Sequence, residues 1–397
     1  MVFQNTCWIQ GNGLKMRNKF LPYGKQSIDK DDISEVDKVL KSDWLTTGPK
    51  VSEFEENFCR YICCKYAVAV NSGTSALDIA VASIGLKKGS EIITTPFTFV
   101  ATANCILYNN LKPVFVDIKK DTYNINPDEI KKKITSKTKA IIYVDYAGQP
   151  CDISEIIKIA NENNLYLIED AAHACGAEYK NKKVGNFADL TEFSFHPVKH
   201  ITTGEGGMVT TDNKELYEKL KLLRNHGIDK DATTRFGKDA SYAYDMKLLG
   251  RNYRITDFQC ALGISQLKKL DDFIKRREQI VKIYDEEFEN IDEVTTPYVK
   301  TNIKHAWHIY TILLYEKINR DKFFNLMKAK NIGVNVHYIP IYKFSYYKEN
   351  FNFNDKDFTV TEDVFSRIIT LPLFQGMNDE DAYDVINAVK NTINELS

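Results

Sequence analysis

Short apolar runs alternate with longer amphipathic segments through the first half of the chain. The runs are almost continuously hydrophobic, as is typical of parallel strands that are buried on both faces. The segments between them repeat apolar residues at the spacing of an α-helix. We therefore expect strands at 66–71, 91–95, 113–118, 140–145, 165–170, 190–195 and 207–211, and helices at 75–84, 127–134, 154–163 and 214–224.

This alternation predicts an α/β fold with a seven-stranded, mainly parallel sheet and helices on both faces. The pattern changes after about residue 255, where a long, broken helical stretch at 258–289 is followed by shorter mixed elements. These are strands near 307–314 and 334–338 and helices at 320–330 and 379–395. We divide the chain into an N-terminal extension (1–18), a large domain (19–255) and a smaller C-terminal α+β domain (256–397).

Composition and charge exclude several classes of protein. The 397 residues are 43% hydrophobic and carry a formal net charge of −1, so we expect no partner among nucleic acids or anionic membranes. No apolar run has the length of a membrane span, and the N-terminus lacks the apolar stretch of a signal peptide. The cysteines form no C-x-x-C pair, and no histidine lies near Cys59, Cys63 and Cys64 at zinc-site spacing. We expect reduced thiols, no metal and a cytoplasmic location.

One lysine carries most of the chemical information in this sequence. Lys199 lies between a strand-like run ending at Phe195 and a glycine-rich turn at 204–207. A lysine placed in this way is suited to hold pyridoxal 5′-phosphate (PLP) as a Schiff base, provided that a carboxylate faces the ring nitrogen and N–H groups surround the phosphate. The flanking His196 and His200 are expected to be structural.

Asp170 is the predicted carboxylate. Glu169 and Asp170 end an apolar strand, where an unpaired acid is costly. Alternation along the strand places the two side chains on opposite faces, and we choose Asp170 as the partner of a pyridinium nitrogen. His173 follows in the next turn, where it either lies against the cofactor ring or is an ordinary turn histidine.

The phosphate-binding candidates open a helix. Gly73, Thr74 and Ser75 follow a strand, so that two hydroxyl groups stand beside free N–H groups at a helix N-terminus. A plain helix cap is the alternative interpretation of this motif. Ser194, close to Lys199, is a further candidate donor to the phosphate.

Aromatic and polar residues outside these motifs complete the candidate set. Phe99 leaves the end of a strand and is preferred over Phe97 for stacking on a planar cofactor, with a core phenylalanine as the alternative. Four polar or aromatic residues in loop-like segments are candidates for contacts with cofactor or substrate: Thr47, Asn252, His337 and Tyr338.

The motifs together resemble the DegT/DnrJ/EryC1/StrS family of PLP-dependent sugar aminotransferases, which have the type I fold of PLP enzymes. The resemblance extends from about residue 19 to residue 393. It is carried by WLTTGPKVSEFE, NSGTSAL, TPFTFVATAN, PVFVDI, IEDAAHA, FSFHPVKHITTGEGG, GRNYRITDFQCALG and LPLF.

The resemblance implies roles for individual residues. Lys199 would form the Schiff base, Asp170 would contact the pyridine nitrogen and Phe99 would stack on the ring. The positions that match phosphate-binding residues of the family are Thr74, Ser75 and Ser194, with Asn252 reaching in from a partner subunit. The family further implies a homodimer with shared active sites, L-glutamate as the amino donor and a nucleotide-linked keto sugar as the acceptor.

Two subgroups of the family are similar to this chain. The segments DYAG, FHPVKHITT, ALGISQLKKLD and VHYIPIYKFSYYK resemble the transaminase of pseudaminic acid biosynthesis, which acts at C4 of a UDP-linked 4-keto-6-deoxy-N-acetylhexosamine. WLTTGPK, HAWH, SRIITLPLF and the insert at 231–244 resemble the UDP-4-amino-4-deoxy-L-arabinose aminotransferase, which has a lysine where Asn252 stands here. We prefer the 4-keto-6-deoxy hexose as the acceptor.

Three other classes are less consistent with the sequence. PLP-dependent sugar dehydratases of this family have histidine in place of the Schiff-base lysine, whereas Lys199 is present here. A non-catalytic relative would have no need of both Lys199 and Asp170. A dinucleotide-dependent dehydrogenase would carry G-x-G-x-x-G after its first strand, and this chain does not.

Overall fold

The large sheet is the central feature of the computed structural model, which describes residues 17–229 and 243–396. Its seven strands follow the order β1-β9-β8-β5-β4-β2-β3. Their bounds are Tyr66–Val70 (β1), Glu91–Thr94 (β2), Lys112–Phe115 (β3), Thr138–Val144 (β4), Tyr166–Asp170 (β5), Leu190–Ser194 (β8) and Gly207–Thr211 (β9).

Only β9 runs against the other strands of this sheet. It pairs antiparallel with β1 on one side and with β8 on the other, whereas β8, β5, β4, β2 and β3 pair parallel. Six strands therefore end at the same edge. In sheets of this kind, ligands bind beyond the carboxyl ends of the strands.

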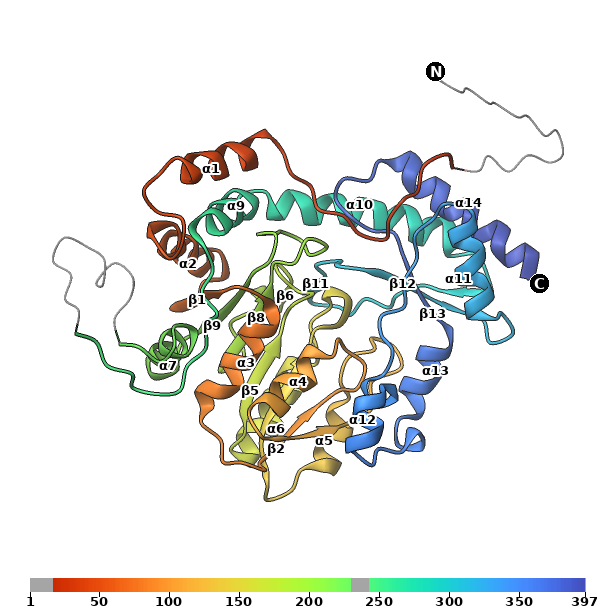
Figure 1. Cartoon of the computed structure of the whole chain (residues 1–397). Coiled ribbons are helices and arrows are strands. Elements are labelled where there is room, and N and C mark those ends of the chain that lie inside the picture. The colour runs from red at the N-terminus through yellow and green to blue at the C-terminus, as the bar shows by residue number, and fades with distance from the viewer. Residues whose placement is uncertain (1–16, 230–242, 397) are drawn as a thin grey trace.

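Helices cover both faces of the large sheet (Figure 1). On one face, apolar residues of α3, α4 and α7 share a core with alternate residues of the strands. On the other face, α2 and α9 pack at one side and α5 and α6 at the other. These helices are Pro49–Ile62 (α2), Gly73–Ile84 (α3), Ala101–Tyr108 (α4), Pro127–Lys133 (α5), Ile153–Asn163 (α6), Lys214–Arg224 (α7) and Asp257–Leu267 (α9).

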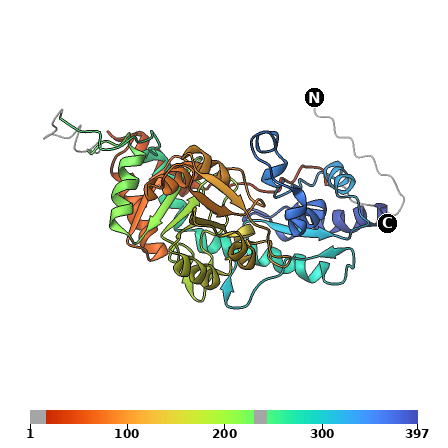
Figure 2. The same ribbon diagram turned by 90° about the horizontal axis from the view of Figure 1, so that it is seen from below.

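A second core forms around a three-stranded sheet of order β10-β12-β13, built from Val294–Thr295, Tyr310–Leu314 and Ile368–Leu371. Figure 2 shows the blue C-terminal elements gathered at one end of the molecule. The long helix α10 (Leu270–Phe288) contributes Ile274 to a core of the large sheet and Ile280 to the second core. Helices α11 (Arg320–Ala329), α13 (Thr359–Arg367) and α14 (Asp379–Leu396) also lie in this part.

The remaining elements are short or peripheral. Helix α1 (Lys30–Leu40) begins with a capping box, in which the Asp29 carboxylate accepts hydrogen bonds from the backbone N–H groups of Asp31 and Asp32. A small sheet of order β11-β6-β7 joins Ile303–Lys304, Glu178–Tyr179 and Lys182–Lys183, and helix α12 spans Ser345–Asn350.

The buried residue Arg277 links α10 to two loops near the edge of the large sheet. Its guanidinium donates to the carbonyl oxygens of Trp307, His308 and Leu373, at 3.2, 3.0 and 2.9 Å. A buried cation is costly unless its donors are satisfied. These bonds hold the backbone of His308 in a fixed position relative to α10.

The predicted fold class is confirmed, with all seven expected strands in one mainly parallel sheet. The strand expected at 334–338 is wrong, because this segment forms only an isolated bridge between Asn335 and Thr370, and residues 335–338 line a cavity. The division of the chain at residue 255 stays a prediction. Residues 1–16 of the expected N-terminal extension and 231–242 of the insert lie outside the described residues.

No helix within the described ranges is long and apolar enough to cross a membrane. The seven cysteines there, including Cys59, Cys63 and Cys64, are free thiols. In the same part of the chain, no group of three or more His, Cys, Asp or Glu side chains is arranged to hold a metal ion.

Candidate active site

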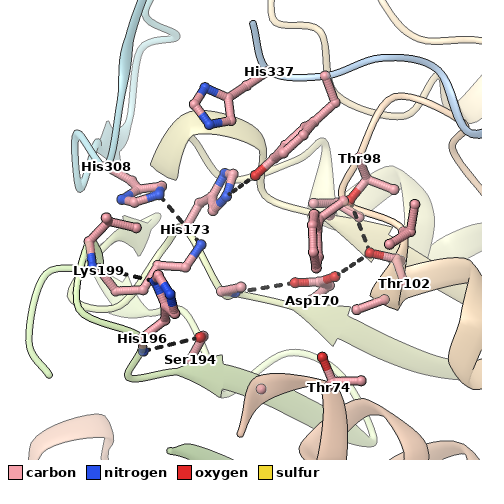
Figure 3. A pocket seen from close by; sticks show the side chains of 18 of the residues that line it. Thr74, Thr98, Thr102, Asp170, His173, Ser194, His196, Lys199, His308 and His337 are labelled. Carbon is pink, nitrogen blue, oxygen red and sulfur yellow. Dashed lines mark hydrogen bonds between the residues drawn. The ribbon is translucent and has the colours of Figure 1, made fainter. Parts of the chain in front are cut away.

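A cavity of about 760 Å³ lies at the edge where the parallel strands end. Its walls include nine of the residues singled out from the sequence: Gly73, Thr74, Phe99, Asp170, His173, Ser194, Lys199, His337 and Tyr338. They come from the ends of β5 and β8, the first turn of α3, the loop before α4 and the segment before η2 (Ile341–Lys343). Figure 3 shows Lys199 and Asp170 facing the same space, with Thr74 and Ser194 below and His337 above.

Lys199 is held in the loop between β8 and β9. Its backbone N–H donates to the carbonyl oxygen of His196, and the loop closes where Phe195 and Gly206 pair. The amine lies 3.4 Å from Nε2 of His308. Burial lowers the pKa of Lys199 to about 8, although the acids Glu192 and Asp170 oppose this shift. About a tenth of the amine is therefore neutral at pH 7, far more than for an exposed lysine, and this fraction is able to act as a nucleophile or proton acceptor.

Asp170 is fixed at the end of β5 by hydrogen bonds to both of its carboxyl oxygens. Thr102 donates through its hydroxyl to Oδ2 at 2.7 Å, and the backbone N–H of Ala172 donates to Oδ1 at 3.3 Å. Thr98 supports Thr102 through a contact of 3.0 Å between their hydroxyl groups. The arrangement orients a carboxylate toward the cavity, where it can pair with a cationic ring nitrogen.

Glu169, the neighbouring acid, points to the opposite face of the sheet. Its Oε2 accepts hydrogen bonds from the backbone N–H of Gly185 and the hydroxyl of Thr191, both at 2.9 Å. The side chains of Glu169 and Asp170 therefore lie on opposite faces of the sheet, as predicted from the sequence.

His173 is a neutral histidine on the cavity wall. The backbone N–H of Ala147 donates to its Nδ1 at 3.3 Å, which leaves the ring proton on Nε2, and Nε2 lies 2.8 Å from the hydroxyl of Tyr338. Burial lowers its pKa well below the usual value, and the Lys199 cation adds to this shift. A neutral ring with a fixed orientation is suited to lie against a flat cofactor.

The first turn of α3 is a candidate anion site. The hydroxyl of Ser72 caps the helix by accepting from the backbone N–H of Ser75 at 3.1 Å, while the earlier N–H groups of Gly73 and Thr74 have no partner within the helix. A side chain could not replace Gly73, because its Cβ would lie 2.9 Å from Cβ of Ser194. Ser75 does not line the cavity, and its hydroxyl instead donates to Asn71 at 2.7 Å.

Phe99 and Phe97 have different surroundings, as expected from the sequence. Phe99 lines the cavity with 57% of its surface exposed, and its ring centre lies 6.3 Å from that of Tyr338. Phe97 is fully buried and packs against Tyr146. Phe99 is thus the one of the two that can stack on a ligand in the cavity.

Two predicted site residues lie elsewhere in the single chain. Thr47 lines a separate, polar cavity of about 470 Å³ that also includes Arg254. Asn252 pairs with Asn225 in a bridge next to α7. The fold of one chain does not bring either residue to the cavity that holds Lys199.

Three of the wall residues without a role in the sequence-based prediction lie next to Lys199 or Asp170. His308 contacts the Lys199 amine, Thr102 holds Asp170, and Glu192 lies beside Asp170 on the neighbouring strand. Thr98 and Thr102 are spaced by one helical turn, which could have indicated a shared polar face. The HAWH motif that contains His308 contributes to the family resemblance. The contact between His308 and Lys199 cannot be predicted from the sequence, because the two residues are far apart along the chain.

Comparison with known proteins places this site in a family. Residues 26–390 match the DegT/DnrJ/EryC1/StrS aminotransferase family. The chain belongs to this family. A UDP-4-amino-4,6-dideoxy-N-acetyl-beta-L-altrosamine transaminase from Campylobacter jejuni is 43% identical over 367 residues, which are 91% of this chain and 94% of that protein.

Two solved structures have the same fold as this DegT/DnrJ/EryC1/StrS aminotransferase. Helicobacter pylori PseC, an aminotransferase of pseudoaminic acid biosynthesis, superposes with a TM-score of 0.90 at 36% identity and covers 95% of this chain and 100% of its own. Spr1654 from Streptococcus pneumoniae, determined in its PLP form, gives a TM-score of 0.89 at 28% identity and covers 95% and 100%. The predictions of an aminotransferase and of PLP as its cofactor are thereby confirmed.

The residues present fit PLP. A buried lysine with a lowered pKa, a carboxylate fixed toward the cavity and an exposed phenylalanine lie around one space, and free N–H groups of α3 border it. Gly73 lets the first turn of α3, with its free N–H groups, lie close to β8, because a Cβ there would be 2.5 Å from Oε1 of Glu192.

Proposed function

We propose that this protein transfers the amino group of L-glutamate to C4 of a UDP-linked 4-keto-6-deoxy sugar in the biosynthesis of a cell-surface glycan of the pseudaminic acid type. The observation that carries this proposal is the pairing of Lys199 and Asp170 across one cavity, in a chain that is 43% identical to a transaminase of a UDP-linked amino sugar. The sugar and the nucleotide are inferred from the relatives, whereas the transamination chemistry is inferred from the residues of this chain.

Lys199 holds the cofactor and moves the proton. When bound, PLP supplies an electron sink that makes the hydrogen on the amino-bearing carbon acidic. The partly neutral amine of Lys199 would hold the cofactor at its aldehyde, and once an amino substrate has displaced it, the same amine would accept the proton from the amino-bearing carbon and hold it for return. Its pKa of about 8 suits both tasks, because the amine must gain and lose a proton near neutral pH.

Asp170 and Phe99 hold the ring in the orientation that this chemistry needs. Asp170 pairs with the proton on the ring nitrogen, and Thr102 keeps the carboxylate aimed at it. Phe99, exposed on the cavity wall, would stack on the ring. The N–H groups of Gly73 and Thr74, together with the hydroxyl of Ser194, bind the phosphate. Ser75 belongs to the same phosphate-binding turn, and Thr47, His337 and Tyr338 are the proposed contacts with the substrate.

The two half-reactions use the same cavity in turn. L-glutamate enters, gives up its amino group and leaves as 2-oxoglutarate before the keto sugar enters. The volume of about 760 Å³ lies within the roughly 300–1,000 Å³ that is common for small-molecule sites. Ping-pong kinetics follow, because one product is released before the second substrate binds.

A homodimer with shared active sites is part of the proposal. Asn252 and Thr47 lie away from the cavity of their own chain. In a homodimer, each residue would contribute to the cavity of the partner subunit. Exposed apolar side chains gather in the sequence segments around these residues: Leu45, Met246, Leu249 and Phe258, which are 37–77% exposed. Burial of such side chains against a second copy is favourable.

The test supplies the purified, PLP-loaded protein with L-glutamate and then with one UDP-linked 4-keto sugar at a time. We expect release of 2-oxoglutarate and, with a 4-keto-6-deoxy-N-acetylhexosamine, a product whose mass shows an amino group in place of the keto oxygen. Amination of the 4-keto pentose alone would assign the enzyme to the arabinose subgroup instead. Release of 2-oxoglutarate with no aminated UDP sugar would overturn the nucleotide or sugar assignment.

A further inference from the structure

Glu192 is a buried acid in the active site that the proposed function does not use. It lies on β8 directly opposite Asp170 of β5 in the parallel register, so both side chains point to the same face of the sheet. Its side chain is fully buried and lines the cavity with Lys199 and Asp170. A carboxyl group in this position is expensive to bury unless something satisfies it.

The hydrogen bonding of Glu192 differs from that of Asp170. Asp170 accepts from Thr102 and from the backbone of Ala172. In contrast, no donor among the described residues reaches either carboxyl oxygen of Glu192. Its Oε1 lies only 2.5 Å from where a Cβ on Gly73 would be, which places the carboxyl group between Asp170 and the first turn of α3.

The two carboxyl groups lie on neighbouring strands in direct register, on the same face of the sheet, and both line the cavity. Two ionised carboxylates at this separation repel one another, and the contact is attractive only when one of them carries a proton. Asp170 already accepts two hydrogen bonds and suits the ionised form. Burial raises the pKa of Glu192 well above its usual value, Asp170 adds to the shift and Lys199 partly opposes it.

We propose that Glu192 is a positioning residue, a neutral carboxylic acid that donates its proton to Asp170 and so holds that carboxylate toward the ring nitrogen of the cofactor. This inference rests on the proposed function only for the role of Asp170. It goes beyond that function by assigning a donor to the buried acid on the neighbouring strand.

The count of acceptor sites on Asp170 supports this role. A carboxylate offers about four lone-pair directions. Thr102 and Ala172 occupy two of them, a third accepts from Glu192, and one remains for the N–H of the cofactor ring. A neutral Glu192 has a second consequence, since an ionised carboxylate beside Gly73 would repel the phosphate that the α3 N-terminus binds.

Three variants test the proposal. Glu192→Gln keeps the shape and an N–H donor but cannot ionise, Glu192→Leu removes the donor, and Glu169→Gln changes the neighbouring acid on the opposite face as a matched control. We expect Glu192→Gln to keep the PLP affinity of the natural protein within about threefold, and Glu192→Leu to lose about tenfold, the effect of one buried hydrogen bond. The visible absorbance of bound PLP should shift only in Glu192→Leu.

Two results would overturn the proposal. If Glu192 is ionised, Glu192→Gln removes a like charge beside Asp170 and the phosphate, so PLP affinity should rise strongly. If Glu192→Leu binds PLP as tightly as the natural protein with the same spectrum, Glu192 positions nothing.

Infrared spectroscopy of the cofactor-free protein provides a measurement that does not depend on transamination or on stable folding of the leucine variant. The natural protein minus Glu192→Gln should show the carbonyl stretch of a protonated carboxyl group at neutral pH. Its absence rules out the neutral acid. Its presence in a protein that fails to aminate any UDP sugar would leave this inference standing while the proposed substrate falls.

Discussion

At the scale of single residues, Lys199 forms its hydrogen bond with a histidine rather than with a carboxylate. Burial and the Lys199 cation both lower the pKa of His308 well below its usual value, so His308 is neutral and accepts from the lysine. A carboxylate in the same place would have stabilised the lysine cation. The neutral partner therefore leaves the amine free to lose its proton near pH 8.

The reactivity of Lys199 in the cofactor-free protein should follow this pKa. Raising the pH through about 8 converts the amine to its neutral, nucleophilic form, so capture of an aldehyde should be half-maximal there. An exposed lysine would reach this point near pH 10.4, roughly its unperturbed pKa. Trapping with pyridoxal and borohydride across a pH series measures the midpoint.

Lys199→Ala serves as the control, since it should remove the labelled site and lower turnover by about 10²–10⁴-fold or more. Full activity in that variant would refute the role of Lys199. A midpoint above pH 10 would refute the effect of burial.

Thr102 should contribute to catalysis without touching the substrate. Thr102→Val removes the hydroxyl that donates to Asp170 at 2.7 Å, and a hydrogen bond to a charged group is worth about 1.5–3 kcal/mol, or roughly ten- to hundredfold in kcat. Steady-state kinetics with L-glutamate measure this loss. Thr102→Ser keeps the hydroxyl and should retain most of the rate; equal losses in both variants would mean that the methyl group, rather than the hydrogen bond, matters.

Residues whose role follows from their position within or after a strand could be predicted from the sequence. Period-two alternation separated Asp170 from Glu169, and position after a strand separated Phe99 from Phe97. His308 and Thr102 were missed because their roles depend on contacts across 109 and 68 positions of the chain, which no local pattern encodes.

At the scale of elements, the N-terminus of α3 depends on a close approach to β8. Gly73 has no side chain, and a Cβ there would lie 2.5 Å from Oε1 of Glu192 and 2.9 Å from Cβ of Ser194. The helix can therefore place its free N–H groups at the cavity only when this position is glycine.

Gly73→Ala should displace the first turn of α3 and weaken PLP binding. Overpacking of this kind costs about 1–3 kcal/mol, so we expect a rise in Kd of roughly five- to 150-fold, measured by spectral titration. Gly376→Ala is the matched control, because its Cβ would meet nothing closer than 3.6 Å. Equal affinity in the two variants would show that α3 can shift without loss.

The elements themselves were largely readable from the sequence. Buried strands such as β4 and β5 are continuous apolar runs, and the break between α9 and α10 was expected within one long helical stretch. The exception is 334–338, which has a strand-like composition but pairs only at Asn335. Side chains from both faces of this segment line the cavity. The local sequence of a segment that lines a cavity looks the same as that of a strand buried in a sheet.

At the scale of the whole molecule, the cavity draws its walls from both cores. Asp170 and Lys199 lie beside the large sheet, while His337 reaches the cavity from the C-terminal part, where its Nδ1 lies 2.8 Å from the hydroxyl of Thr370 on β13. The position of Asn252 outside its own cavity suggests that a second copy completes the site.

A mixing experiment tests shared active sites. Lys199→Ala and Asn252→Asp should each be inactive alone, since one lacks the reactive amine and the other places a negative charge near the phosphate. If Asn252 serves the partner's site, a denatured and refolded equal mixture should regain about a quarter of natural activity, because half of the dimers are mixed and each has one intact site of two.

No recovery in the mixture would show that Asn252 acts within its own chain, and full activity of Asn252→Asp alone would show that Asn252 has no role in the site. The molar mass from light scattering supplies the control, since it must correspond to a dimer for both variants and for the mixture.

The place of β1 in the sheet affects how this protein folds during its synthesis on the ribosome. β1 is an edge strand whose partner is β9, so it waits for about 140 further residues to emerge before it can pair. At about 5–20 residues per second this delay is roughly 7–30 s of translation. The loop that carries Lys199 closes in the same event, as β9 pairs with β8. Capture of the cofactor thus belongs to the late stages of synthesis, and a chain released early would leave β1 unpaired and one edge of β8 exposed to aggregation.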